Sequence, residues 1–252
     1  MKRILLIGIG AGDPDHITVQ AIKALHRVDV FFLLDKGPAK EGLVDLRRML
    51  CERFISGRSY RFVTADSPEW SRSGPDYGAA VDGLNQDKQA IFERLIREEM
   101  LEGETGGVLI WGDPSLYDSS IRIMERLAAG TLGIEYEVFP GISSLQALTA
   151  RHKTTLNRIA KSVEITTGRR LAAAYPPDAD SVAVMLDSEF VAKRYADRDL
   201  EIYWGAYIGT ADEILIAGKL AEVADRIDAV RQQARQEKGW IMDSYLLKQP
   251  DK

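Results

Sequence analysis

A glycine-rich turn that ends in an acidic residue is the part of this sequence that most directly suggests ligand binding. Residues 8–13 read Gly-Ile-Gly-Ala-Gly-Asp and follow the apolar run Ile4 to Ile7. Glycine allows positive φ angles and lets a ligand approach the main chain, which a Cβ would obstruct. A dinucleotide-binding fingerprint requires a third glycine where this chain has Asp13, and a carboxylate there would face the phosphates. Asp13 therefore argues against a pyrophosphate and for a neutral or cationic ligand.

Two later loops have a similar composition of glycine, proline and small polar residues. Residues 112–117 read Gly-Asp-Pro-Ser-Leu-Tyr, and residues 140–144 read Pro-Gly-Ile-Ser-Ser. Each follows an expected strand, and ligands of open parallel sheets bind at the carboxyl ends of the strands, so the three loops together predict one cleft. Helix initiation alone could explain each later loop, because Asp118 fits an N-cap and Ser143 with Gln146 fits a capping box.

Short apolar or β-branched runs alternate with amphipathic stretches along the chain, which predicts an α/β fold. Strands are expected at residues 4–7, 28–34, 107–111, 135–139, 163–166, 182–186, 201–204 and 240–247, and helices at residues 18–26, 43–54, 86–102, 118–127, 143–150 and 220–236. Residues 56–83 break the alternation and predict a long loop. This loop is either a solvated surface excursion or a lid over a ligand, and Trp70 and Tyr77 favour the lid. The alternation fails again near residues 151–160, so we expect domains at 1–155 and 156–252.

The composition of the 252 residues excludes several classes of function. Acidic residues outnumber basic ones, 38 to 33, which argues against nucleic acid or an anionic membrane as a partner. The single Cys51 and three scattered histidines supply no cluster at zinc spacing, so we expect no metal. The first residues pass from Met1 into a short strand without a signal-peptide or membrane-spanning segment, which favours the cytoplasm.

The three loops, taken in order, resemble those of the tetrapyrrole methyltransferases of cobalamin and sirohaem synthesis. Longer segments at residues 31–37, 111–119, 156–159, 165–171, 202–207 and 238–247 resemble the members that remove an acetyl group from a precorrin. The resemblance implies two α/β domains with S-adenosylmethionine, which leaves as S-adenosylhomocysteine, bound between them, and not a Rossmann nucleotide-binding fold. It also implies a strand over residues 213–220, although Thr210-x-x-Glu213 has the pattern of a helix capping box.

The resemblance assigns the cofactor contacts by position in the chain. They are Trp111, Gly112, Asp113, Leu116, Ser143, Ser144, Met185 and Tyr207. Many relatives have proline at the position of Ala11, so the details of the first loop differ, and the match around Tyr207 does not fix which backbone atom is used. We expect the first turn, with Gly10 and Asp13, to lie closer to the tetrapyrrole than to the cofactor.

The chemistry of methyl transfer fits these residue types. A sulfonium methyl donor is cationic and already activated, so the protein must hold donor and acceptor in line and exclude water. A precorrin carries acetate and propionate side chains, which arginine or lysine would bind. The basic candidates are Lys36, Arg122, Arg169 and Arg170, and the alternative for each is a solvated surface role.

The reaction that the resemblance implies removes the acetyl group of precorrin-5 as acetate and methylates C1. In our hypothesis, a base-activated water adds to the acetyl carbonyl, and C–C cleavage leaves a nucleophilic carbon that takes the methyl group. Asp35, at the end of the second expected strand, is the first candidate for the base, and Tyr117 is the second. Asp35 could instead be a cap or a partner for Lys36.

Other functions stay open at this level. Gly8-x-Gly10 followed by Asp35 also imitates a dinucleotide fold, so an NAD-dependent oxidoreductase is the rival class, against which Asp13 and the two later loops argue. Another specificity within the family and a non-catalytic tetrapyrrole-binding relative are the further alternatives. The habit of the family favours a homodimer.

Overall fold

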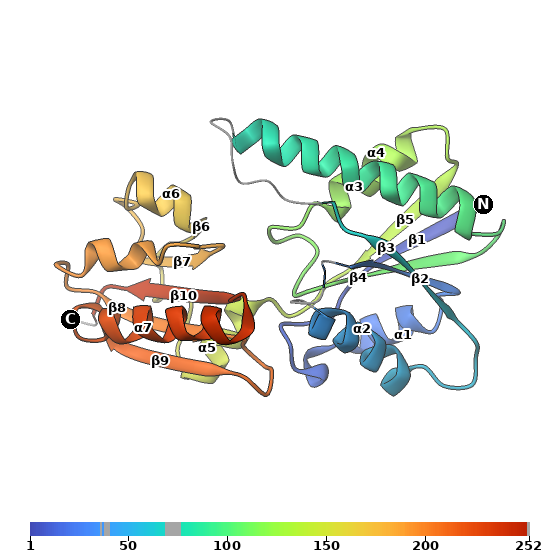
Figure 1. Cartoon of the computed structure of the whole chain (residues 1–252). Coiled ribbons are helices and arrows are strands. Elements are labelled where there is room, and N and C mark those ends of the chain that lie inside the picture. Colours follow the sequence, from blue (N-terminus) through green and yellow to red (C-terminus); the bar gives the residue numbers. More distant parts are fainter. Residues whose placement is uncertain (36, 38–40, 69–76, 251–252) are drawn as a thin grey trace. The chain divides into compact units, whose positions relative to one another are not determined.

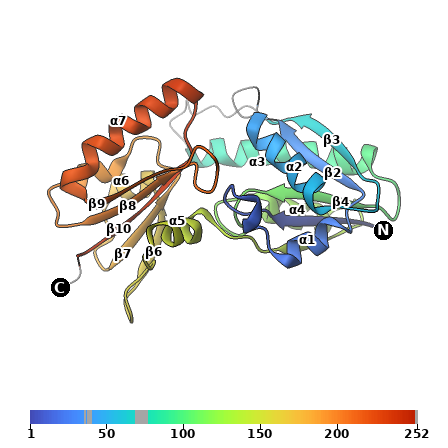
Figure 2. The same ribbon diagram turned by 90° about the horizontal axis from the view of Figure 1, so that it is seen from below.

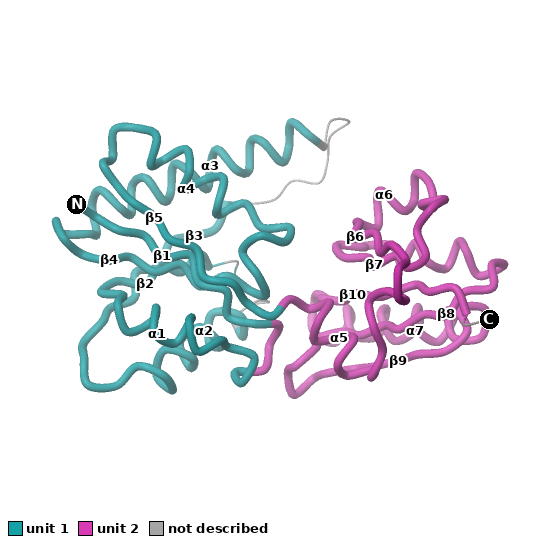
Figure 3. The backbone as a smooth tube through the Cα atoms, turned by 180° about the vertical axis from the view of Figure 1, so that it is seen from behind, with its two compact units in different colours: residues 1–10, 14–142 teal, residues 11–13, 143–252 magenta. Residues whose placement is uncertain are grey.

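The computed structural model describes residues 1–35, 37, 41–68 and 77–250. Contacts divide the chain into two compact units, residues 1–10 with 14–142 and residues 11–13 with 143–252 (Figure 3). The main division therefore falls at residues 142 and 143, earlier than the expected boundary at 155 and 156. The physical reason is that helix α5 (Ser144–His152) packs against strands of the second unit, so it belongs there.

The first unit is a doubly wound α/β layer structure around a five-stranded parallel sheet of order β3-β2-β4-β1-β5. Helices α1 and α2 lie on one face of this sheet, and α3 and α4 lie on the other (Figure 1). The elements are β1 (Lys2–Gly8), the short 3-10 helix η1 (Pro14–His16), α1 (Val19–Leu25), β2 (Val30–Asp35), α2 (Glu41–Phe54), β3 (Arg61–Asp66), α3 (Tyr77–Glu99), β4 (Thr105–Ile110), α4 (Ser120–Ala129) and β5 (Ile134–Phe139).

The alternation of side chains along β1 shows why the sheet is covered on both faces. Ile4 and Leu6 belong to the core cluster beneath α3 and α4, whereas Leu5 and Ile7 belong to the cluster beneath α1 and α2. All four are fully buried. Each such side chain contributes about 1.5–3 kcal/mol, so an unbroken apolar strand is stable only between two helical layers.

The second unit is built on a mixed five-stranded sheet of order β6-β7-β10-β8-β9, in which only the β6–β7 pair is parallel. The buried rings of Trp204 and Tyr245 lie in the core beneath α7, and Figure 2 shows α7 along one side of the sheet, with α5 on the other side. The remaining elements are β6 (Val163–Thr167), α6 (Gly168–Ala173), β7 (Ser181–Met185), the 3-10 helix η3 (Val191–Tyr195), β8 (Glu201–Ala206), β9 (Ile214–Lys219), α7 (Leu220–Lys238) and β10 (Asp243–Lys248).

Two expectations about secondary structure differ in outcome. The long loop predicted for residues 56–83 was wrong for Arg61–Asp66, which is β3, and from Tyr77 onward, where α3 begins. Trp70 lies outside the described residues, as does the side chain of Tyr77. The strand implied near Glu213 is confirmed as β9, and the preceding residues form a turn.

No helix in the described part of the chain is both long enough and apolar enough to cross a membrane.

Candidate functional site

Three glycines have their backbones in close contact at the carboxyl ends of three neighbouring strands in the first unit. Gly8 ends β1, Gly112 follows β4, and Gly141 follows β5. A Cβ on Gly8 would lie 2.6 Å from the nitrogen of Gly141, and a Cβ on Gly141 would overlap the carbonyl oxygen of Gly112. The structure therefore brings parts of all three predicted loops to one edge of the sheet, with bare main chain at their contact.

Gly10 fixes the first turn onto the second loop. Its carbonyl accepts a hydrogen bond from the nitrogen of Gly112 at 2.8 Å, and its φ of 85° lies in the region that favours glycine. A Cβ at this position would lie 2.5 Å from Cβ of His16. Close packing of the backbone therefore accounts for the glycine at position 10.

Asp113 joins the second loop to the third. Its Oδ2 accepts a hydrogen bond from the nitrogen of Gly141 at 2.9 Å, and its Oδ1 accepts from the nitrogen of Ser115 at 2.8 Å and from the Ser115 hydroxyl. Burial raises the pKa of the Asp113 carboxyl, but these hydrogen bonds outweigh that effect and leave its pKa below the usual value. The carboxylate is thus negative at neutral pH and suited to a cationic or hydroxyl-bearing ligand.

The residue just before the second loop and the last residue of that loop have unusual environments. The indole Nε1 of Trp111 is buried and has no hydrogen-bond partner in the described structure. Such a group costs about 1–3 kcal/mol, so it is a place where a ligand oxygen would be favourable. Tyr117 has a φ of 54° and an exposed side chain, whereas Leu116 is partly buried.

In the second unit, three expected cofactor residues lie near one another. Ser143 forms the predicted capping box with Gln146 and so begins α5. The hydroxyl of Ser144 lies 3.1 Å from that of Ser244, and Ser244 stands opposite Met185 in the pairing of β10 with β7. Ser244 is not among the cofactor contacts predicted from the sequence, although it lies in the segment 238–247 that resembles the family.

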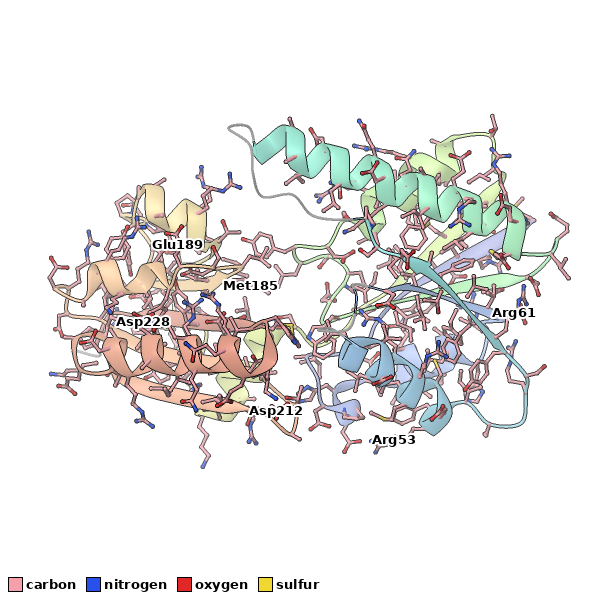
Figure 4. The ribbon with its side chains drawn as sticks, in the orientation of Figure 1. Arg53, Arg61, Met185, Glu189, Asp212 and Asp228 are labelled. Carbon is pink, nitrogen blue, oxygen red and sulfur yellow. The ribbon has the colours of Figure 1, made fainter. Side chains whose placement is uncertain are left out.

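Met185 is the last residue of β7, and Figure 4 labels it beside Glu189 in the next turn. Leu186 follows with a φ of 54° and an exposed side chain. Behind this turn, the Asp187 carboxylate accepts hydrogen bonds from the nitrogen of Val191 at 2.7 Å and from the Tyr245 hydroxyl at 2.6 Å. The turn is therefore held from beneath by a buried carboxylate.

Tyr207 follows β8 in a left-handed conformation, with a φ of 49°. Its nitrogen donates to the carbonyl of Met242 at 2.9 Å, and its hydroxyl donates to the carbonyl of Trp240 at 2.6 Å. Burial raises the pKa of this phenol. Gly12 packs against Ile208, the residue after Tyr207, because a Cβ on Gly12 would lie 2.6 Å from the carbonyl oxygen of Ile208. Residues 11–13, including Asp13, consequently belong to the second unit.

The candidates for acting on the substrate belong to different elements of the two units. Asp35 ends β2, and its Oδ1 accepts from the nitrogen of Gly37 at 2.8 Å, which is the capping role considered as the alternative. Arg122 is exposed on α4, and Arg169 and Arg170 are exposed at the beginning of α6. Lys36 lies outside the described residues.

Comparison with known proteins identifies the family. The family model described as tetrapyrrole (corrin/porphyrin) methylases matches residues 3–224. The chain belongs to the tetrapyrrole methylase family. A precorrin-6A synthase (deacetylating) from a Sinorhizobium species is 49% identical over 249 residues, which cover 98% of this chain and 95% of that protein.

Solved structures agree with the family fold. A cobalamin-synthesis-related protein from Corynebacterium diphtheriae superposes with a TM-score of 0.82 at 33% identity over 100% of both chains. The uroporphyrin-III C-methyltransferase of Thermus thermophilus, determined with S-adenosylhomocysteine, has a TM-score of 0.60 at 19% identity over 98% of this chain and 97% of that one, and supports the fold alone. Membership in the methylase family excludes the NAD-dependent oxidoreductase and makes S-adenosylmethionine the cofactor.

Proposed function

We propose that this chain is a precorrin-6A synthase, which methylates C1 of precorrin-5 and releases its acetyl group as acetate. The observation that carries the proposal is the 49% identity over nearly the whole of both chains to a precorrin-6A synthase (deacetylating). The segments that resemble this subfamily lie in both halves of the chain.

The residues of the two units suit the cofactor. When bound, S-adenosylmethionine supplies an activated methyl group on a cationic sulfur. The ionised Asp113 favours a positive charge or a ribose hydroxyl, and the bare main chain at Gly112 allows a close approach. Ser144 and Met185, with Ser244, offer hydroxyls and an apolar surface. We assign cofactor binding to these residues together with Trp111, Leu116, Ser143 and Tyr207.

Deacetylation requires a base, because water must lose a proton as it adds to the acetyl carbonyl. The C–C bond then breaks, acetate leaves, and the electron pair stays on the macrocycle, where carbon accepts the methyl group. We assign the base to Asp35 in preference to Tyr117. Oδ1 of Asp35 is occupied by the nitrogen of Gly37, so its Oδ2 is the oxygen to take the proton.

The test is turnover of precorrin-5 with S-adenosylmethionine, with acetate and the methylated product both quantified. We expect one acetate for each methyl group transferred. Methylation without acetate would indicate another specificity in the family, and cofactor binding without turnover would indicate a non-catalytic relative.

The role of Asp35 has its own test. We expect Asp35→Asn to lower the rate of acetate release by about 100-fold or more, as for loss of a general base, with little change in the Kd for S-adenosylhomocysteine. Asp66→Asn is the matched control, because Asp66 stands opposite Asp35 at the end of the neighbouring strand. Undiminished acetate release and methylation by Asp35→Asn would remove Asp35 as the base.

The homodimer and the cytoplasmic location expected for a family member stay predictions. Light scattering checks the first, since a dimer of this 28.1 kDa chain has twice that mass.

A further inference from the structure

Arg47, on α2, is placed unusually for an arginine. Its Nε donates to the carbonyl oxygen of Leu109 at 2.9 Å, and its Nη1 donates to that of Leu43, one turn earlier on the same helix, at 2.6 Å. Leu109 is the penultimate residue of β4 and lies three residues before Gly112. The guanidinium therefore reaches the carboxyl end of the strand that carries the second glycine loop.

The sheet opens where Arg47 enters it. The pairing of β2 with β4 ends at Phe32 and Val108, although β2 continues to Asp35 and β4 to Ile110. The carbonyl of Ile110 accepts from the nitrogen of Ile9, just after β1, so the carbonyl of Leu109 points to the opposite side, where β2 has separated. The Nε of Arg47 thus supplies the hydrogen bond to Leu109 that β2 no longer provides, at the gap between the ends of β2 and β4.

The charge of Arg47 is offset only in part, by the charge of Asp118. No carboxylate forms an ion pair with it in the part of the chain that the structure describes, and burial lowers the pKa of its guanidinium to about 10, although the charge of Asp118 raises it. Two carbonyls use only two of its five N–H groups. A partly buried guanidinium that has no ion-pair partner among the described residues is costly, so the arrangement favours an anionic ligand.

The other arginines of α2 have different roles. Arg48 stacks on the ring of Phe62, with its Cζ 4.6 Å from the ring centroid, and Arg53 pairs with Asp15 at the surface. Trp111, whose Nε1 has no hydrogen-bond partner in the described structure, comes directly after β4 and two residues after Leu109. In the described part of the chain, an unsatisfied donor and a cation without an ion-pair partner therefore both lie at this strand end.

We propose that Arg47 binds a peripheral carboxylate of the tetrapyrrole substrate. The proposal rests on the function proposed above, which supplies a substrate with acetate and propionate side chains. The planar fork of arginine can hold a carboxylate through two parallel N–H···O bonds, which the donors not used by Leu109 and Leu43 would provide. Arg47 then orients the macrocycle and takes no part in bond making.

Binding measurements on Arg47→Met test this role. The probe is uroporphyrin III, a fluorescent tetrapyrrole with eight carboxylates, and S-adenosylhomocysteine is titrated in parallel. We expect the Kd for uroporphyrin III and the KM for precorrin-5 to rise by about 10- to 100-fold, as for loss of a charge-assisted hydrogen-bonded pair. The Kd for S-adenosylhomocysteine and kcat should change less than about twofold. Arg48→Met, which removes a charge from the same helix, should leave both affinities unchanged.

Each other outcome decides against the proposal. Unchanged uroporphyrin affinity in a variant that still binds S-adenosylhomocysteine would overturn it, and a selective loss of S-adenosylhomocysteine binding would assign Arg47 to the carboxylate of the cofactor instead. If Arg47→Met does not fold, Arg47→Lys decides, since it keeps the charge but loses the fork and should still weaken uroporphyrin binding. Because these titrations need no turnover, they stand even if the wild-type protein fails to convert precorrin-5.

Discussion

Asp113 is the side chain that ties two glycine loops of the first unit together, and its charge makes that link sensitive to pH. Its pKa is lowered in the folded protein, so the stability it contributes is present above the unfolded pKa of about 3.9 and is lost as the pH falls through the folded value. We expect Asp113→Asn to lower the Tm at pH 7, and the difference from wild type to narrow below about pH 4. A difference that stays constant from pH 7 to pH 3 would contradict the ionised link.

Gly141 is the residue where a single methyl group should do the most damage. A Cβ there would overlap the carbonyl oxygen of Gly112 and lie 2.9 Å from the backbone of Gly8, and none of these backbone atoms can yield easily. We expect Gly141→Ala to cost about 3 kcal/mol or more of unfolding free energy, measured by urea denaturation. Gly83→Ala is the control: apart from the backbone of α3 itself, no atom of the described residues lies within 4 Å of the added Cβ, so it should stabilise by about 0.5–1 kcal/mol.

At the scale of elements, the turn after β7 depends on a buried network contributed by η3, α7 and β10. The carboxylate of Asp187 accepts from Tyr245, and the Asp187 carbonyl accepts from Arg231, which is itself buried and donates to Asp243. Because Met185 stands two residues earlier, this network should position a proposed cofactor contact.

Tyr245→Phe tests that dependence. Removal of a hydroxyl that donates to a buried carboxylate should cost about 1.5–3 kcal/mol in urea denaturation and raise the Kd for S-adenosylhomocysteine. Tyr203→Phe is the matched control, because the Tyr203 hydroxyl donates to the partly exposed Glu201 at 2.9 Å and should contribute about 1 kcal/mol or less. Equal effects of the two substitutions on cofactor affinity would show that the network has no special role in binding.

The elements that the sequence predicted well are those whose apolar pattern is strong, such as β1, which is buried on both faces. β3 escaped prediction because it is an edge strand in which only Ala65 is buried, so its residues show little apolar signal. The beginning of α3 escaped because polar residues and Gly83 interrupt its period. β9 followed from the family resemblance and not from local sequence, since a tight turn at Thr210 has the same pattern as a helix cap.

The candidate site shows the same limit. The glycines at the strand ends made the loops at Gly8, Gly112 and Gly141 predictable, because only glycine lets the backbones of neighbouring loops lie this close together. Ser244 and Arg47 carry no such signal, since a serine in a strand and an arginine in a helix are ordinary. Their interest comes from long-range pairing, of β10 with β7 and of α2 with the open end of β4, which only the folded chain reveals.

At the scale of the whole molecule, the two units have separate hydrophobic cores, so local unfolding of each unit can be followed separately by hydrogen exchange. The family resemblance assigns cofactor contacts to both units, to Gly112 and Asp113 in the first and to Ser144 and Met185 in the second. S-adenosylhomocysteine at 100 times its Kd stabilises its binding-competent state by about 2.7 kcal/mol, or about 100-fold in the opening equilibrium. We therefore expect slower amide hydrogen exchange in residues 105–116 and in residues 144–152 and 181–185 alike. Protection confined to one unit would show that this unit alone binds the cofactor, and NAD at the same concentration should protect neither.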